Sequence, residues 1–64
     1  MPMVTVEWLE GRTAHQKAQL AARITQAFID VSQVTKEQVW IAFHDVKRSD
    51  WAMGGELTGV EVVL

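Results

Sequence analysis

Residues 3–13 have the sequence MVTVEWLEGRT, and this stretch decides the fold. β-Branched and aromatic side chains recur at every second position over residues 3–9, a period that predicts a β-strand. A Glu-Gly pair then ends the strand, because glycine adopts backbone angles that other residues resist. Thr13 is followed three residues later by Gln16, a spacing typical of a capping box. The stretch therefore predicts a strand followed directly by a helix that begins at Thr13.

The region after Thr13 has the periodicity of an amphipathic helix and should end near Ser32 and Gln33. Polar and charged residues supply the wetter face of this helix. Its apolar side chains recur at spacings of three and four residues, and they are Leu20, Ala21, Ile24, Ala27, Phe28 and Val31.

A second strand is predicted over residues 39–46, after a single turn that Thr35 and Gln38 would cap. Both faces of this strand are largely apolar, so we expect it to be covered on both sides. Strand, helix and strand within about 45 residues make a β-α-β unit, whose strands run parallel with a right-handed crossover. The expected fold class is α+β.

The rest of the chain predicts a polar turn over residues 47–50, a break at Gly54 and Gly55, and a C-terminal hairpin or short strand over residues 60–64. We expect one domain over residues 1–64. Below about 70–80 residues a lone core is thermodynamically thin, and without cysteine neither disulfides nor thiolate metal sites can reinforce it. A two-stranded sheet also leaves a bare face and open edges, so self-association is predicted.

Charge and hydropathy exclude several classes of partner. Six Lys and Arg against eight Asp and Glu give a net charge of −2, the wrong sign for a phosphate-backbone binder. No apolar run approaches the roughly 18–20 residues that span a bilayer, and a signal sequence is not evident. We therefore expect no nucleic-acid or membrane partner and a cytoplasmic location.

Ordinary catalytic patterns are missing from the sequence. His15 and His44 are far apart and do not form a metal-binding pattern, and no metal site is expected. Pro2 is the exception, because a small second residue normally permits removal of the initiator methionine. The proline nitrogen would then be a free secondary amine that can take and return a proton or attack a carbonyl. The alternative is that a proline at this position has no role.

The sequence resembles the 4-oxalocrotonate tautomerase family over nearly its whole length. The resemblance rests on Pro2, on LEGRT at residues 9–13, on Gln16-Lys17 with Leu20, on residues 39–46, and on WAMGGEL at residues 51–57. It implies a β-α-β subunit, dimers with a four-stranded sheet, and a homohexamer built as a trimer of dimers. It also implies a cofactor-free tautomerase that acts on small 2-hydroxy-dienoate or enolpyruvate-type acids in aromatic compound degradation.

The resemblance assigns roles to particular residues. Pro2 would be the general base and then the general acid, and Arg12 would bind a substrate carboxylate and draw electron density from the reacting carbon. Trp51 would keep the site apolar. Leu9 and Trp40 are not assigned by the resemblance, and they are further candidates for contact with the substrate. A strand of this length spans roughly 23 Å at ~3.3 Å per residue, so Arg12 cannot reach Pro2 of its own chain. If the two residues act together, a neighbouring chain must supply Arg12.

Trp40 is a departure from the family, because muconate-processing members have a second arginine there. The tryptophan could instead suit an aromatic or monocarboxylate substrate, although packing explains it equally well. One alternative function is dehalogenation, hydration or decarboxylation of a small unsaturated acid, with Asp45, Asp50 or Glu56 activating water. Another is a non-catalytic oligomeric module that binds aromatic ligands between tryptophans.

Overall fold

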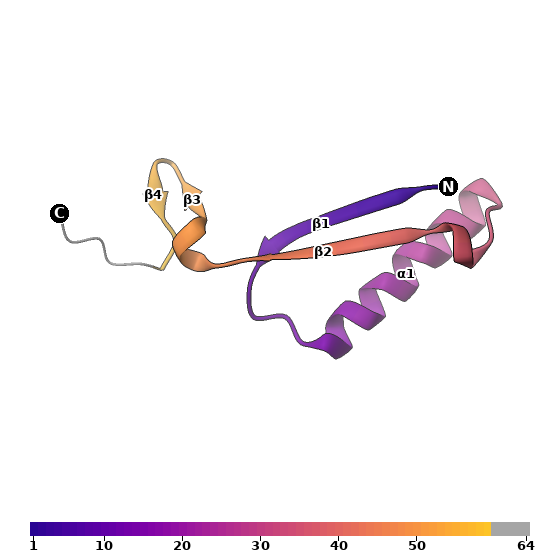
Figure 1. The fold of residues 1–64 in the computed structure, drawn as a ribbon, viewed down its shortest axis with the longest axis horizontal. Helices are drawn as coiled ribbons and strands as arrows, with labels where there is room; N and C mark the ends of the chain where they lie inside the picture. The colour runs from indigo at the N-terminus through magenta and orange to yellow at the C-terminus, as the bar shows by residue number, and fades with distance from the viewer. Residues whose placement is uncertain (60–64) are drawn as a thin grey trace.

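A computed structural model describes residues 1–59, which form a β-α-β unit followed by a small hairpin (Figure 1). The elements are β1 (Met3–Leu9), α1 (Ala14–Ser32), η1 (Lys36–Gln38), β2 (Trp40–Val46), η2 (Arg48–Asp50), β3 (Ala52–Met53) and β4 (Glu56–Leu57), where η marks a 3₁₀ turn. The predicted β-α-β unit is confirmed. Its second strand begins one residue later than expected, because the Val39 amide donates to the Lys36 carbonyl and closes η1. The expected strand over residues 60–64 lies outside the described residues.

β1 and β2 lie side by side and run parallel, from Met3 opposite Trp40 to Leu9 opposite Val46. Parallel strands need a long crossover, and α1 provides it along one side of the pair (Figure 1). Both strands therefore begin at one end of the unit and finish at the other, where β3 and β4 continue the chain. This arrangement decides which of the candidate site residues can meet within one chain.

The start of α1 is fixed by the predicted capping box. The Thr13 side chain accepts a hydrogen bond from the Gln16 amide at 3.1 Å, and the Gln16 side chain accepts one from the Thr13 amide at 3.0 Å. The helix ends where Gln33 adopts a left-handed backbone with φ 55° and donates to the Ile29 carbonyl. Over residues 1–59, no helix is long and apolar enough to cross a bilayer.

One face of the strand pair packs against α1. Trp8 and Phe43 from neighbouring strands stack on this face, with ring centroids 5.4 Å apart. Val4, Val6 and Trp8 are half-buried at alternate positions of β1, as a half-covered sheet requires, and Leu9 at the end of the strand is half-buried as well.

The face of α1 that packs on the strands is rotated from the predicted one. Thr25 and Ile29 are half-buried, although the apolar pattern did not include them. Val31 and Ala27 were expected to be covered and are exposed instead, Val31 by 83%. A sheet of two strands is too narrow to cover all of the apolar side chains of α1, so those along one edge of the apolar face remain exposed. That edge borders a shallow hollow of about 240 Å³, lined by Ala27, Phe28, Val31 and Ser32.

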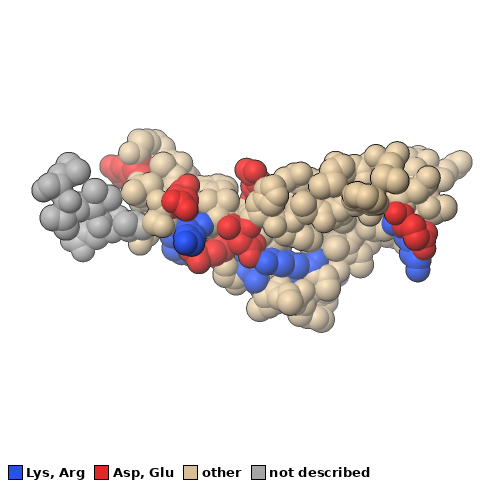
Figure 2. Space-filling view, viewed as in Figure 1, with Lys and Arg blue, Asp and Glu red and all other residues tan. Residues whose placement is uncertain are grey.

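None of the described residues is fully buried. On the sheet face away from α1, Met3 is 58% exposed and Trp40 is 57% exposed. Figure 2 shows few charged atoms along the strand surface toward the N-terminus. Within residues 1–59, β2 is therefore covered on one side only and no closed core forms, which supports the expectation that other chains complete it.

Candidate active site

Pro2 and Trp40 lie together where β1 and β2 begin. The Trp40 amide donates to the Pro2 carbonyl at 3.1 Å, which extends the pairing of the strands by one bond. The Trp40 indole is held by a hydrogen bond from Nε1 to the Glu37 carbonyl at 3.3 Å, yet the side chain remains largely exposed. Pro2 itself is half-buried. While Met1 is attached, the Pro2 nitrogen belongs to an amide and cannot act as a base.

Leu9, Arg12 and Trp51 lie toward the opposite end of the strands. The Glu10 amide donates to the Val46 carbonyl at 2.9 Å, and the Glu10 carboxylate accepts from the Arg48 amide at 3.0 Å. The first bond continues the pairing of β1 with β2, and the second joins η2 to the residue that follows β1. Trp51 follows η2 directly and is half-buried, with its amide donating to the Arg48 carbonyl at 3.3 Å.

The Gly-Gly pair forms the turn of a hairpin just after Trp51. Gly54 and Gly55 have φ angles of 62° and 87°, and two positive values in succession are typical of a type I′ turn. The Thr58 amide then returns to donate to the Trp51 carbonyl at 2.8 Å. The backbone of Trp51 is therefore held twice, through its amide by Arg48 before it and through its carbonyl by Thr58 after the hairpin.

Arg12 lies on the exposed loop between β1 and α1, and its guanidinium carbon is 5.6 Å from the centroid of the Trp8 ring. This distance is within the range of a cation–π contact. Neither of the two ion pairs found in residues 1–59 involves Arg12. Its hydrogen-bond donors are therefore not neutralised by a carboxylate of the described chain, and they could bind the carboxylate of a ligand.

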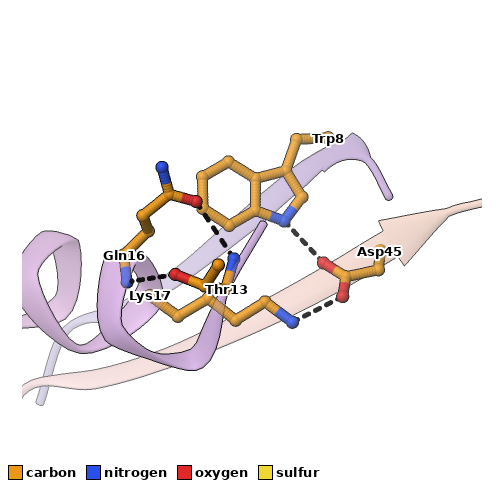
Figure 3. Close-up of polar contacts among 5 residues, drawn as sticks. All are labelled: Trp8, Thr13, Gln16, Lys17 and Asp45. Carbon is orange, nitrogen blue, oxygen red and sulfur yellow. Dashed lines mark hydrogen bonds and ion pairs between the residues drawn. The ribbon is translucent and has the colours of Figure 1, made fainter. Parts of the chain in front are cut away.

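Trp8, Asp45 and Lys17 form a polar cluster that the sequence did not reveal (Figure 3). The Trp8 indole Nε1 donates to Asp45 Oδ1 at 2.7 Å, and the Lys17 ammonium donates to Asp45 Oδ2 at 2.5 Å. These bonds lower the pKa of Asp45, the Lys17 bond most and the Trp8 bond next, and partial desolvation opposes them. The parallel register places Trp8 opposite Asp45, so the pair can be found only once that register is known.

The cluster includes Asp45, one of the three carboxylates that could activate water in the alternative function. Both oxygens of Asp45 already accept hydrogen bonds within the chain, so this residue is poorly suited to activating water. Asp50 and Glu56 are exposed, on η2 and β4. His44 approaches Glu7 at 3.5 Å on the sheet face away from α1, and no group of three metal-ligating side chains occurs within residues 1–59.

One chain therefore holds two separate groups of candidate residues. Pro2 and Trp40 lie at the start of the strands, whereas Leu9, Arg12 and Trp51 lie toward their end. The seven residues of β1 separate the groups by roughly 23 Å at ~3.3 Å per residue. If these residues act on one substrate, different chains must supply them.

Comparison with known proteins identifies the family of this chain. The family model described as "Tautomerase enzyme" matches residues 2–61. The chain belongs to the tautomerase family. A probable tautomerase of Ralstonia nicotianae is 39% identical over 61 residues, which cover 95% of this chain and 94% of the relative. The 2-hydroxymuconate tautomerase of Bacillus subtilis is 32% identical over 56 residues, covering 88% of this chain and 90% of that protein.

Solved structures agree with this assignment. A 4-oxalocrotonate tautomerase homologue superposes with a TM-score of 0.85 at 33% identity, covering 89% of this tautomerase and 90% of the homologue. A heterohexameric 4-oxalocrotonate tautomerase from Chloroflexus aurantiacus has a TM-score of 0.78 at 31% identity, covering 86% and 89% of the two chains. The predicted α+β tautomerase fold is confirmed, and the chain is a tautomerase enzyme.

Proposed function

We propose that this tautomerase, a single domain over residues 1–64, interconverts the enol and keto forms of a small 2-hydroxy-dienoate or enolpyruvate-type acid without a cofactor. Pro2, freed by removal of Met1, is the acid–base group. The family match and the 2-hydroxymuconate tautomerase relative support the reaction class. The choice of Pro2 is supported by its position just before β1, where it is half-buried and its carbonyl accepts a hydrogen bond from the Trp40 amide.

The proposed reaction moves one proton and changes no other atoms. The neutral amine of Pro2 accepts a proton from the enol hydroxyl, which leaves a delocalised enolate. The resulting ammonium then returns the proton to a carbon of the conjugated system, which completes a 1,3- or a 1,5-proton shift from the hydroxyl oxygen. An apolar wall and a nearby guanidinium both disfavour the protonated amine, so they keep Pro2 able to accept the first proton.

The active site in this proposal lies between chains. The observation that carries it is the separation of Pro2 from Arg12 by the whole length of β1. Arg12 of a neighbour would bind the substrate carboxylate, and Trp51 would supply the apolar wall. Leu9 and Trp40 would line the rest of the pocket. The assembly proposed is a homohexamer of three dimers, each with a four-stranded sheet, and the exposed sheet face with Met3 and Trp40 supports such burial.

Trp40 sets the proposed substrate preference. Its indole offers a large flat surface and one N–H donor, and that donor already bonds to the Glu37 carbonyl. No positive charge is available from this position for a second carboxylate. We therefore favour aryl enolpyruvates or other monocarboxylates over dicarboxylates as substrates.

Two measurements test the proposal together. Intact-mass spectrometry should give a mass without Met1, since an acylated Pro2 nitrogen cannot accept a proton. A Pro2→Ala protein should lose most of its ketonisation of phenylenolpyruvate while it elutes at the wild-type size. A retained methionine, or an unchanged rate in the variant, would remove Pro2 from the mechanism.

The same preparation distinguishes other reactions on this scaffold. Incubation with a 3-haloacrylate should release halide more slowly than phenylenolpyruvate is ketonised. Faster halide release would favour a dehalogenase that uses Asp50 or Glu56 to activate water. Ligand binding with neither activity would instead indicate a non-catalytic module.

A further inference from the structure

We propose that Trp8 is a positioning residue for Arg12 and that Asp45 holds Trp8 in place. The indole ring fixes the guanidinium, which then binds the carboxylate of the substrate. This inference rests on the proposed function, in which Arg12 is the carboxylate anchor.

The contact between Arg12 and Trp8 leaves the arginine free to bind. A guanidinium 5.6 Å from a ring centroid interacts through the π-system of the ring, which carries no charge. Such a contact can leave the N–H groups of the guanidinium available, whereas a carboxylate partner would occupy them and cancel the positive charge. Trp8 therefore restrains Arg12 without competing with the substrate.

The restraint is useful because Arg12 lies on an exposed loop. Gly11, the residue before it, has a φ of 114°, a backbone conformation that side chains other than glycine's rarely adopt. A long side chain on such a loop loses rotamer freedom when it binds, and part of that loss is avoided if it is ordered beforehand. We infer that Trp8 provides this ordering before substrate arrives.

Trp8 can do so because two contacts fix its own ring. Its Nε1 donates to Asp45 Oδ1 at 2.7 Å (Figure 3). Its ring also stacks on Phe43 with planes 27° apart. Asp45 is fixed in turn by the Lys17 ammonium of α1 on its other oxygen. Successive contacts thus connect Lys17 on α1 through Asp45 and Trp8 to Arg12 on the loop.

Substitutions at the two positions should change substrate affinity more than turnover. Trp8→Leu removes the ring, Trp8→Phe keeps a ring without the donor, and Asp45→Ala removes the acceptor. With phenylenolpyruvate, Trp8→Leu and Asp45→Ala should raise KM by about two- to fivefold, the range of exposed cation–π contacts, and leave kcat nearly unchanged. Trp8→Phe keeps a ring but loses the hydrogen bond to Asp45, so it should raise KM at least as much as Asp45→Ala does. Asp45→Asn, which keeps an acceptor, should restore much of the affinity. The methyl ester of the same enol should show no such rise, because it lacks the carboxylate.

Glu7→Ala is the matched control. It removes a carboxylate from the same strand pair, next to His44 at 3.5 Å, and Glu7 has no contact with Trp8 among those found in residues 1–59. This variant should keep the wild-type KM. All variants are compared at wild-type size by gel filtration, and if Trp8→Leu fails to assemble, Asp45→Ala and Trp8→Phe carry the measurement.

A double-mutant cycle with Arg12→Ala decides the mechanism. If Trp8 acts through Arg12, Asp45→Ala and Trp8→Leu raise KM in the wild-type background and have no further effect when Arg12 is already absent. A rise that persists without Arg12, an equal rise with the ester, or no rise in any assembled variant overturns the positioning role. If Arg12→Ala itself leaves KM unchanged, it is the proposed function of Arg12 that fails.

Discussion

Two variants of this tautomerase that each have low activity should restore activity to each other when their chains are mixed. Pro2→Ala removes the proposed proton carrier, and Arg12→Ala removes the proposed carboxylate anchor. The seven residues of β1 hold these positions roughly 23 Å apart at ~3.3 Å per residue, so a site must take them from different chains. In a mixed oligomer, some sites then combine an intact Pro2 from one variant with an intact Arg12 from the other.

The size of the recovery follows from this geometry. With equal amounts of the two variants and random exchange, half of the chains supply an intact Pro2 and half supply an intact Arg12. About one quarter of all sites in such a symmetric assembly then contain both. Losing a charge-assisted contact of about 1.5–3 kcal/mol lowers kcat/KM by one to two decades, so Arg12→Ala sites contribute little at low substrate concentration. The mixture should recover close to a quarter of wild-type activity.

The assay is ketonisation of phenylenolpyruvate below its KM, after the variants are unfolded together and refolded. Each variant refolded alone, and the two combined after separate refolding, should stay near the low activity of the parents. Equal activity of the exchanged mixture and the unexchanged mixture would refute the shared site, because it would mean that one chain supplies both residues.

Three other predictions follow from single contacts. Thr13→Ala removes half of the capping box, so the free energy of unfolding should fall by about 1 kcal/mol in chemical denaturation at equal protein concentrations; an unchanged midpoint would refute the role of the cap. In the folded chain the pKa of Asp45 is lowered from its ordinary value of 3.8. The stabilisation from the ionised Asp45 carboxylate is therefore complete above pH 3.8 and is lost as the pH falls through the folded pKa. Thermal unfolding of Asp45→Asn should therefore lose less stability on acidification than the wild type does, and parallel pH profiles would contradict this. Trp40→Arg should raise kcat/KM for 2-hydroxymuconate relative to phenylenolpyruvate by about one decade or more, as measured by competing the two substrates; no change in the ratio would show that residue 40 does not contact the second carboxylate.

The local signals of the sequence were sufficient for the β-α-β unit. The period of two over residues 3–9, the capping box at Thr13 and the repeated cap at Thr35 each act within a few residues of chain, and each is confirmed. The helical face was predicted less well. Periodicity identifies an apolar stripe, but which part of it is covered depends on the width of the sheet, and two strands leave Val31 exposed.

Only part of the candidate site could likewise be predicted from the sequence. Pro2, Arg12 and Trp51 were selected from the sequence through a family resemblance, and their roles remain proposals. Trp8 and Asp45 are 37 positions apart and meet only because the strands pair in this register. No pattern within either segment indicates the hydrogen bond between them, although a correct alignment of the two predicted strands would have found the pair.

The parallel pairing of β1 and β2 explains both the exposed face of the sheet and the separation of the candidate site residues into two groups. Two parallel strands place both of their beginnings at one end, so Pro2 and Trp40 are neighbours, and they place Leu9 and the segment leading to Trp51 at the other end. No side-chain movement within one chain can bring these ends together. A second chain whose strands run in the opposite direction would bring its Arg12 end to the Pro2 end of the first, and the same docking would cover apolar residues that are exposed in one chain. In the proposed assembly, the apolar surface that a single chain leaves exposed would therefore also complete the active site, and dilution to separated chains should remove stability and activity together.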